Sequence, residues 1–273
     1  MARAVGLMQP ADVYAALMEG DPATKCRAAQ ALHAANSSGL SQSTGVAEDV
    51  PIPGRPERPA LVHPSKLARR GLGTDYGRAA LIHAIAHIEF NAINLGLDAA
   101  YRYRGMPADY YADWLSMAAD ESRHFTMLND RLADFGYRYG DFDAHNGLWE
   151  MAVKTAHDPM VRMALVPRVL EARGLDVTPG MIAKLRQVGD DKTVAIFEQI
   201  LEEEVPHVEI GTRWFRYFAE PRGLDPDATF FKLLDEYMNG GPPGPYNIDA
   251  RREARFSEPE LDELQARDGG SNS

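Results

Sequence analysis

Residues 114–128 read WLSMAADESRHFTML and place a carboxylate and an imidazole inside an apolar helical pattern. Met117, Glu121, His124 and Leu128 follow one another at steps of four, three and four, the spacing of the buried stripe of an amphipathic helix. A three-residue step sets the side chains of Glu121 and His124 about 5–6 Å apart on one face. The stretch therefore predicts a buried helix face that can hold a metal ion from one side.

A second Glu-x-x-His motif is formed by Glu204 and His207. Two further glutamates, Glu89 and Glu171, fall where the inward stripe of a predicted helix is otherwise apolar. The separations match: Glu89 to Glu121 is 32 residues (121 − 89) and Glu171 to Glu204 is 33 (204 − 171). Acidic residues precede both motif glutamates, and a glycine follows two of the ligands after seven residues.

One Glu-x-x-His is a weak signal, because Glu and His fall three apart by chance in many helices. Two such motifs together with two more inward glutamates are a strong signal for a metal site. Burying four carboxylates carries a large desolvation cost, and two cations would remove it. The alternative is that the glutamates are solvated or ion-paired surface residues. The pattern favours a two-metal site with the ligands Glu89, Glu121, His124, Glu171, Glu204 and His207.

The helical pattern from residue 74 onward contains no β-branched runs of alternating polarity, which predicts an all-α fold. Four long helices with one long crossover between the second and third are the connectivity of a ferritin-like four-helix bundle, here with short accessory helices. The expected helices are 75–103, 108–135, 148–155, 159–173, one starting at 178, 191–219 and 226–240.

Composition divides the chain into four segments. We expect an N-terminal accessory helical hairpin at 1–36, an extended connector rich in serine, glycine and proline at 37–73, the di-metal bundle at 74–240, and a C-terminal arm or tail at 241–273.

The formal net charge of −11 disfavours a nucleic-acid partner, which needs a concentrated basic surface. The single cysteine, Cys26, allows neither an internal disulfide nor a thiolate metal cluster. The N-terminal stretch lacks the apolar run of a secretory signal, and no window of about 20 residues is free of charge, so no membrane span is expected. A cytoplasmic protein is the default expectation.

From the phrase HIEFNAINL at 87–95 to EEVPH at 203–207, the sequence resembles the ferritin-like di-iron carboxylate superfamily and, within it, the bacterial domain-of-unknown-function family 455. The resemblance covers about residues 64–226 and implies the bundle fold and iron ligands at the six positions above. Pro206 departs from the commonest pattern, because an interior proline removes a backbone donor and predicts a kink beside His207.

Four residues near the ligands are candidates for a supporting role. His83 and His87 are rotated away from the stripe of Glu89, so we favour second-shell or surface positions for them over metal ligation. Asp120 and Glu203 could accept the ring proton of a ligating histidine, with exposed salt bridges as the equal alternative. For Phe90, Phe125 and Phe197, we expect core packing ahead of a substrate or oxygen cavity.

Carboxylate and imidazole ligands suit two iron ions, with Mn/Fe or Mn/Mn pairs as alternatives. The leading hypothesis is a non-haem di-iron oxidoreductase, an oxidase or hydroxylase that uses molecular oxygen or peroxide and an organic substrate or electron donor. The alternatives are an iron-handling protein with ferroxidase or peroxide-scavenging activity, and a metal-stabilised protein-interaction module. Assembly as a homo-oligomer is left open by the sequence.

Overall fold

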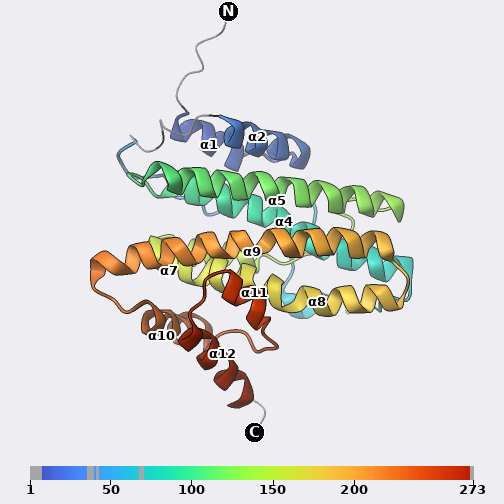
Figure 1. Ribbon diagram of the computed structural model, residues 1–273. Helices are drawn as coiled ribbons and strands as arrows, with labels where there is room; N and C mark the ends of the chain where they lie inside the picture. The colour runs from blue at the N-terminus through green and yellow to red at the C-terminus, as the bar shows by residue number, and fades with distance from the viewer. Residues whose placement is uncertain (1–7, 36–39, 41–42, 68–70, 271–273) are drawn as a thin grey trace, which may run out of the picture. The chain divides into compact units, whose positions relative to one another are not determined.

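The computed structural model is predominantly helical (Figure 1). The residues that it describes are 8–35, 40, 43–67 and 71–270. Within them, extended pairing is limited to one isolated bridge between Leu61 and Ala144. The prediction of an all-α protein is confirmed, and parts of the predicted N-terminal hairpin and connector lie outside the described residues.

The chain divides into two compact units, residues 1–153 and 154–273. The division passes through the segment 74–240, which the sequence predicts to be a single bundle. Each unit is described by itself below. The assembly of the four long helices into one ferritin-like bundle therefore stays a prediction.

In its described residues, the first unit contains three short α-helices, two long ones and a single 3₁₀ turn, and the five α-helices are those that the sequence predicts. Asp21 caps the second helix by accepting a hydrogen bond from the backbone nitrogen of Thr24, and Thr74 caps the third in the same way at Gly77. The helices are α1 (Pro10–Leu17), α2 (Pro22–Ala34), η1 (Pro64–Lys66), α4 (Asp75–Arg102), α5 (Ala108–Asp134) and α6 (Gly147–Lys154).

Close packing of α4 against α5 depends on Gly96, seven residues after Glu89. A Cβ atom at this position would lie 2.9 Å from the carbonyl oxygen of Trp114 and 3.0 Å from the Cβ of Ala118. The glycine therefore lets the two long helices approach each other about two turns beyond Glu89, which keeps the stretches that carry Glu89 and Glu121 side by side.

We expect Gly96→Ala to lower the free energy of unfolding by about 1–3 kcal/mol, because the added methyl group overpacks this contact. Gly174→Ala is the matched control, since a Cβ atom at Gly174, inside a helix, meets nothing within 4 Å. It should raise stability by about 0.5–1 kcal/mol. Urea unfolding followed by circular dichroism measures both; destabilisation of equal size in the two variants would contradict the close-packing argument.

The connector is bound to the crossover segment and to α6 by backbone and side-chain hydrogen bonds. The backbone nitrogen of Val62 donates to the carbonyl oxygen of Ala144 at 2.8 Å, and that of Ala144 to the carbonyl oxygen of Ala60 at 3.0 Å. The indole nitrogen of Trp149 on α6 donates to the carbonyl oxygen of Pro51 at 3.0 Å. These contacts fix the connector beside α4, where it forms one wall of a pocket considered further below.

In its described residues, 154–270, the second unit contains eight helical elements. They are α7 (Pro159–Leu165), the π-helical turn η2 (Val166–Glu171), α8 (Ala172–Gln187), α9 (Asp191–Ala219), η3 (Glu220–Arg222), α10 (Pro226–Met238), α11 (Ile248–Glu253) and α12 (Glu258–Gly270), of which η3 is a single 3₁₀ turn closing α9.

The predicted end of the third long helix at Gly174 is wrong. The helix runs through Gly174 and Pro179 to Gln187 as α8, with Leu175, Ile182 and Leu185 buried along it. An interior glycine costs only about 1 kcal/mol, so burial of this apolar stripe outweighs the local break signals. The helix α9 likewise continues through Pro206.

Residues 241–270, for which the sequence predicts an arm or tail, contain two helices packed on the second unit. Arg251 of α11 pairs with Asp176 of α8 at 2.7 Å, and Glu260 of α12 pairs with Arg168 at 2.5 Å. All four side chains are buried. Buried ion pairs of this kind hold a segment whose composition alone suggests disorder.

One helix is long and apolar enough to cross a membrane, judged by length and composition alone. It is α4, and 72% of its most apolar window is buried inside the protein. The core helix of a folded domain passes the same test.

Candidate metal centre

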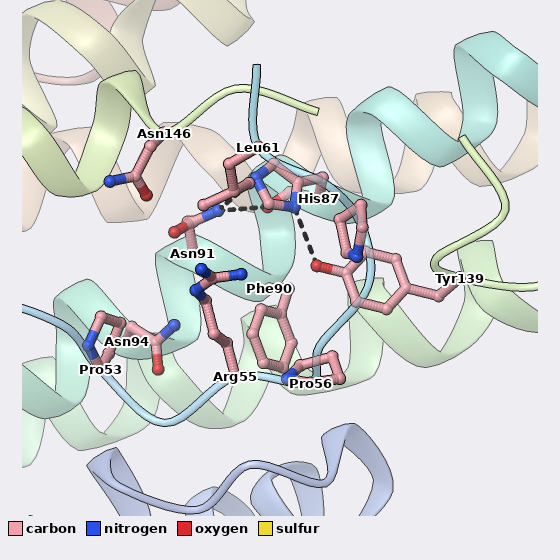
Figure 2. A pocket seen from close by; sticks show the side chains of 11 residues that line it. Pro53, Arg55, Pro56, Leu61, His87, Phe90, Asn91, Asn94, Tyr139 and Asn146 are labelled. Carbon is pink, nitrogen blue, oxygen red and sulfur yellow. Dashed lines mark hydrogen bonds between the residues drawn. The ribbon is translucent and has the colours of Figure 1, made fainter. Parts of the chain in front are cut away.

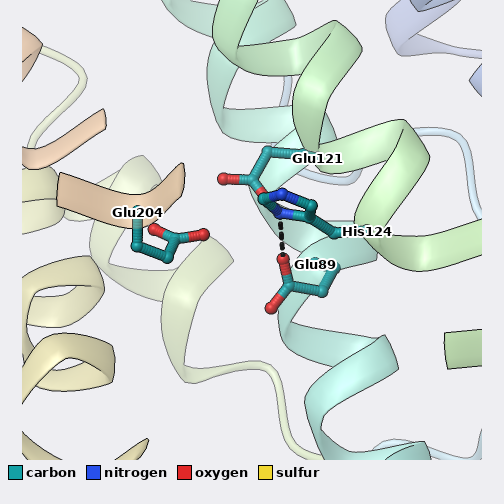
Figure 3. Close-up of side chains that lie close together, drawn as sticks. All are labelled: Glu89, Glu121, His124 and Glu204. Atoms are coloured by element: carbon teal, nitrogen blue, oxygen red, sulfur yellow. Dashed lines mark hydrogen bonds and ion pairs between the residues drawn. The ribbon is translucent and has the colours of Figure 1, made fainter. Parts of the chain in front are cut away.

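The first unit brings together three of the predicted ligands, Glu89 from α4 with Glu121 and His124 from α5 (Figure 3). The Nδ1 atom of His124 lies 3.2 Å from Oε2 of Glu89 and 3.3 Å from Oε2 of Glu121. Each residue offers a ligand atom within 4.8 Å of the others. All three side chains are buried, with Glu121 and His124 at 0% exposure.

The electrostatics of this cluster are those of a site that attracts cations. Burial by itself lowers the pKa of His124, but its hydrogen bonds to Glu121 and Glu89 and their negative charges outweigh burial and raise the pKa to about 11. In the metal-free protein, the imidazole is therefore protonated at neutral pH and serves as the counter-ion of the two carboxylates.

The donor set fits a transition-metal ion. Carboxylate oxygens and an imidazole nitrogen are ligands for iron, manganese or zinc, and two helices fix them from different directions. A cation with two or three charges would compensate the carboxylates more fully than the His124 proton does. Metal binding here would replace that proton.

The second unit carries the other three predicted ligands, and all of them are buried: Glu171 at 6%, Glu204 at 9% and His207 at 2% exposure. Within the motif on α9, Nδ1 of His207 lies 3.6 Å from Oε1 of Glu204. Glu171 is the last residue of η2. In the described part of the chain, these three residues do not by themselves gather ligand atoms within 4.8 Å of one another.

The π-helical turn that ends at Glu171 was not predicted from the sequence. Pro167 lies in this turn and has no backbone N–H to offer to the preceding turn, which is a common cause of such a distortion. A Cβ atom at Gly211 of α9 would lie 2.4 Å from the ring of Pro167. The glycine seven residues after Glu204 therefore allows close packing, as Gly96 does in the first unit.

His83 and His87, for which we predict second-shell or surface positions, are both buried, at 0% and 6% exposure, which excludes the surface alternative. Burial lowers the pKa of each to about 4, so both rings are neutral. Their hydrogen bonds run to residues 139–145: the backbone nitrogen of Gly140 donates to Nε2 of His83 at 2.9 Å. A part in orienting the metal ligands stays a prediction.

Both ring nitrogens of His87 have hydrogen-bond partners. Nε2 lies 3.0 Å from the carbonyl oxygen of His145 and 3.0 Å from Nδ2 of Asn91. Nδ1 lies 2.8 Å from the hydroxyl of Tyr139. The ring of Tyr139 packs on Phe90 and Phe125, the residues that follow Glu89 and His124, with centroids 5.5 and 5.0 Å away.

Asp120 and Glu203 form hydrogen bonds or ion pairs at exposed or part-exposed positions, which was the alternative to a hydrogen bond with a ligating histidine. Asp120 accepts a hydrogen bond from Arg123 at 2.6 Å, with both side chains about two-fifths exposed, and Glu203 accepts one from Gln199 at 3.1 Å on an exposed face. Tyr139 is the residue near the cluster that sequence reasoning missed. It lies in the crossover, where no helical periodicity indicates its orientation.

The fold and this cluster define an all-α protein with buried carboxylate and histidine side chains that could hold a metal ion. The chain belongs to the family described as "Protein of unknown function (DUF455)", which matches residues 18–262. It is similar to an "Uncharacterized protein" of Haemophilus influenzae (strain ATCC 51907 / DSM 11121 / KW20 / Rd), with 46% identity over 262 residues that cover 92% of this chain and 91% of the relative. No solved structure matches the chain. The resemblance to family 455 is confirmed, and membership of the ferritin-like superfamily stays a prediction.

Proposed function

We propose that this protein is a ferritin-like di-iron carboxylate protein, and that it acts as an oxygen-activating oxidase or hydroxylase on an organic substrate. The observation that carries the proposal is the buried group of Glu89, Glu121 and His124. Two carboxylates and an imidazole at 0–4% exposure are costly to bury, and a metal ion offsets that cost.

The sequence spacing in the second unit supports a second set of ligands. Glu204 and His207 repeat the Glu-x-x-His spacing of Glu121 and His124, and Glu171 precedes Glu204 by nearly the interval that separates Glu89 from Glu121. We propose that the two sets meet and hold two ions between them. Two Glu-x-x-His motifs with two further glutamates are the donor set of a dinuclear carboxylate centre in a helical bundle.

A pair of iron ions, when bound, supplies the electrons that reduce oxygen or peroxide, and Mn/Fe or Mn/Mn pairs suit the same donors. The protein's own contribution is to hold the ligands and keep water away from them. Phe90 and Phe125 contact each other at 5.5 Å between ring centroids and follow two of the ligands directly, so they provide an apolar wall beside the cluster. His124 gives up its proton when it binds a metal ion.

Anaerobic reconstitution with ferrous iron should load about two ions per chain, because the six proposed ligands match a dinuclear site. Iron analysis after desalting measures the stoichiometry, and thermal unfolding with and without iron measures the accompanying stabilisation. Iron content near zero, together with an unchanged melting temperature, would refute the metal site.

Admission of oxygen then separates an enzyme from an iron-handling protein. A substrate-oxidising centre in a dry site should oxidise about two ferrous ions per chain and then stop, since the apolar wall offers no polar exit for ferric iron. The optical absorbance of ferric iron against time, with excess ferrous iron present, records the number of turnovers. Sustained turnover with mineral formation would instead establish the ferroxidase alternative.

A further inference from the structure

A small pocket in the first unit is lined by hydrogen-bond donors and by no acidic residue (Figure 2). It lies between the connector and α4, and its cavity of ≈ 10 Å³ has room for about one water molecule. Pro53, Pro56 and Pro59 form part of its apolar wall. The absence of Asp and Glu from its lining is notable in a chain with a net charge of −11. The polar lining residues are Arg55, His87, Asn91, Asn94, Tyr139 and Asn146.

Asn94 is the residue that points to a ligand. Its side chain is 1% exposed, and its Oδ1 accepts a hydrogen bond from the ammonium group of Lys25. Because an ammonium group only donates, this contact fixes which end of the amide faces Lys25. The Nδ2 group at the other end has no hydrogen-bond partner in the described part of the chain. A buried N–H group left without an acceptor is costly, so the site favours a ligand that accepts.

Lys25 makes this donor stronger. Its Nζ, at 0% exposure, donates to three neutral acceptors, namely Asn94 and the carbonyl oxygens of Leu17 and Gly54, both at 2.8 Å. None of these acceptors carries a negative charge that would neutralise the ammonium group. Its positive charge therefore draws electron density from the Asn94 amide, which makes the N–H groups on Nδ2 stronger hydrogen-bond donors. Burial lowers the pKa of Lys25 to about 7, so the ammonium form predominates below neutral pH.

Arg55 supplies a second positive charge at the pocket. It is exposed, and no described residue forms a hydrogen bond or an ion pair with its guanidinium group. Asn91 and Tyr139 are already engaged with His87, which leaves Arg55, Asn94 and Asn146 as the donors available to a ligand. A planar guanidinium group matches the two oxygens of an oxyanion.

We propose that this pocket binds a small oxyanion, either a carboxylate of about the size of formate or an inorganic oxyanion such as nitrate. The anion accepts from Nδ2 of Asn94 and from the guanidinium group of Arg55, and it balances the buried charge of Lys25. Such an anion is larger than the cavity of ≈ 10 Å³, so binding requires the exposed side chain of Arg55 to move outward and close on the ligand. This site is separate from the proposed metal centre and does not depend on it.

The test is a titration of the full chain at about pH 6, recorded through the side-chain amide signals of asparagine in ¹H–¹⁵N spectra. Sodium formate, sodium nitrate and sodium chloride are compared at equal ionic strength. A saturable shift of the Asn94 amide with formate alone identifies a carboxylate site, and a similar shift with nitrate identifies a general oxyanion site. No saturable shift with either ion, or an equal shift with chloride, overturns the proposal.

Three variants separate the site from general charge effects. Arg55→Gln should weaken binding about tenfold or more, since a charge-assisted hydrogen bond is lost. Arg58→Gln removes the same charge from the same exposed connector but does not line the pocket, and it should leave affinity unchanged. Asn94→Asp keeps an acceptor for Lys25 but replaces the free donor with a negative oxygen, and it should abolish binding, which is then followed through the side-chain amide of Asn91 at the same pocket. Equal weakening by the two arginine variants would overturn the assignment.

Discussion

Replacing Arg168 with methionine is expected to lower the free energy of unfolding of the second unit by about 3–5 kcal/mol, the usual cost of removing one partner from a buried ion pair. Arg168 and Glu260 are both at 0% exposure, and Nη2 of Arg168 lies 2.5 Å from Oε1 of Glu260. The guanidinium group also lies over the rings of Phe230 and Phe256, at 4.1 and 4.5 Å from their centroids. Its loss removes the closest cation from the buried carboxylate of Glu260, whose remaining partners on Oε2 are Arg216 at 3.6 Å and the backbone nitrogen of Ser257 at 2.9 Å.

Arg267→Met is the matched control for this prediction. Arg267 lies on α12, as Glu260 does, but its ion pair with Asp235 at 2.6 Å is largely exposed and should contribute at most about 1 kcal/mol. Urea unfolding measures the stability of both variants, and amide hydrogen exchange reports whether α12 detaches first. The double variant Arg168→Met with Glu260→Leu should recover much of the loss, because no buried charge is then left unpaired. Similar small losses for Arg168→Met and Arg267→Met would contradict the prediction.

The helices that the sequence predicted correctly are those with local start signals. Asp21, Asp158 and Asp225 each precede a proline, and each caps its helix in the structure. An N-cap side chain and a first-turn proline act within four residues of each other, so they can be recognised without knowledge of the tertiary structure. The long helices α4, α5 and α9 also end within a residue of the predicted positions.

The errors arose where contacts distant in sequence outweigh local signals. Gly174 and Pro179 predict a break, but the burial of Leu175 and Ile182 keeps α8 continuous. The C-terminal segment resembles a tail in composition, yet Arg251 binds Asp176 from 75 residues away. A pairing at that separation leaves no periodic pattern in the sequence.

The candidate site was predictable to the extent that it depends on helix geometry. The three-residue step places Glu121 and His124 together on α5, and the apolar stripe of α4 turns Glu89 inward, so the cluster of the first unit is as expected. The environment of His87 was not predictable, because its partner Tyr139 lies in the crossover. The same holds for the donor-lined pocket, which depends on the course of the connector.

Glu121→Ala is expected to weaken metal binding by more than about 100-fold, since even residues that only orient a ligand change metal affinity 10- to 100-fold. Asp120→Ala is the matched control: it removes the same charge one residue away, from a part-exposed side chain paired with Arg123. Its metal affinity should stay close to that of the unchanged protein. Competition with a coloured chelator measures both affinities, and equal losses in the two variants would indicate a general charge effect instead of ligation.

The pH dependence of metal binding follows from the raised pKa of His124. The carboxylates of Glu121 and Glu89 overcome burial and hold this pKa at about 11, above the ordinary value of 6.5. The resulting stabilisation of the metal-free fold is fully present below about pH 6.5 and is lost as the pH rises through the folded pKa. Metal must displace this proton at neutral pH, so the affinity for metal should rise about tenfold per pH unit between about pH 7 and 9.

In Glu121→Ala, the largest contact that raises the pKa of His124 is gone. The pH dependence of metal affinity should therefore flatten, because His124 loses its proton at lower pH. Release of about one proton per bound ion, followed with a pH indicator in weak buffer, tests the same exchange directly; uptake of metal without proton release would show that His124 is not a ligand.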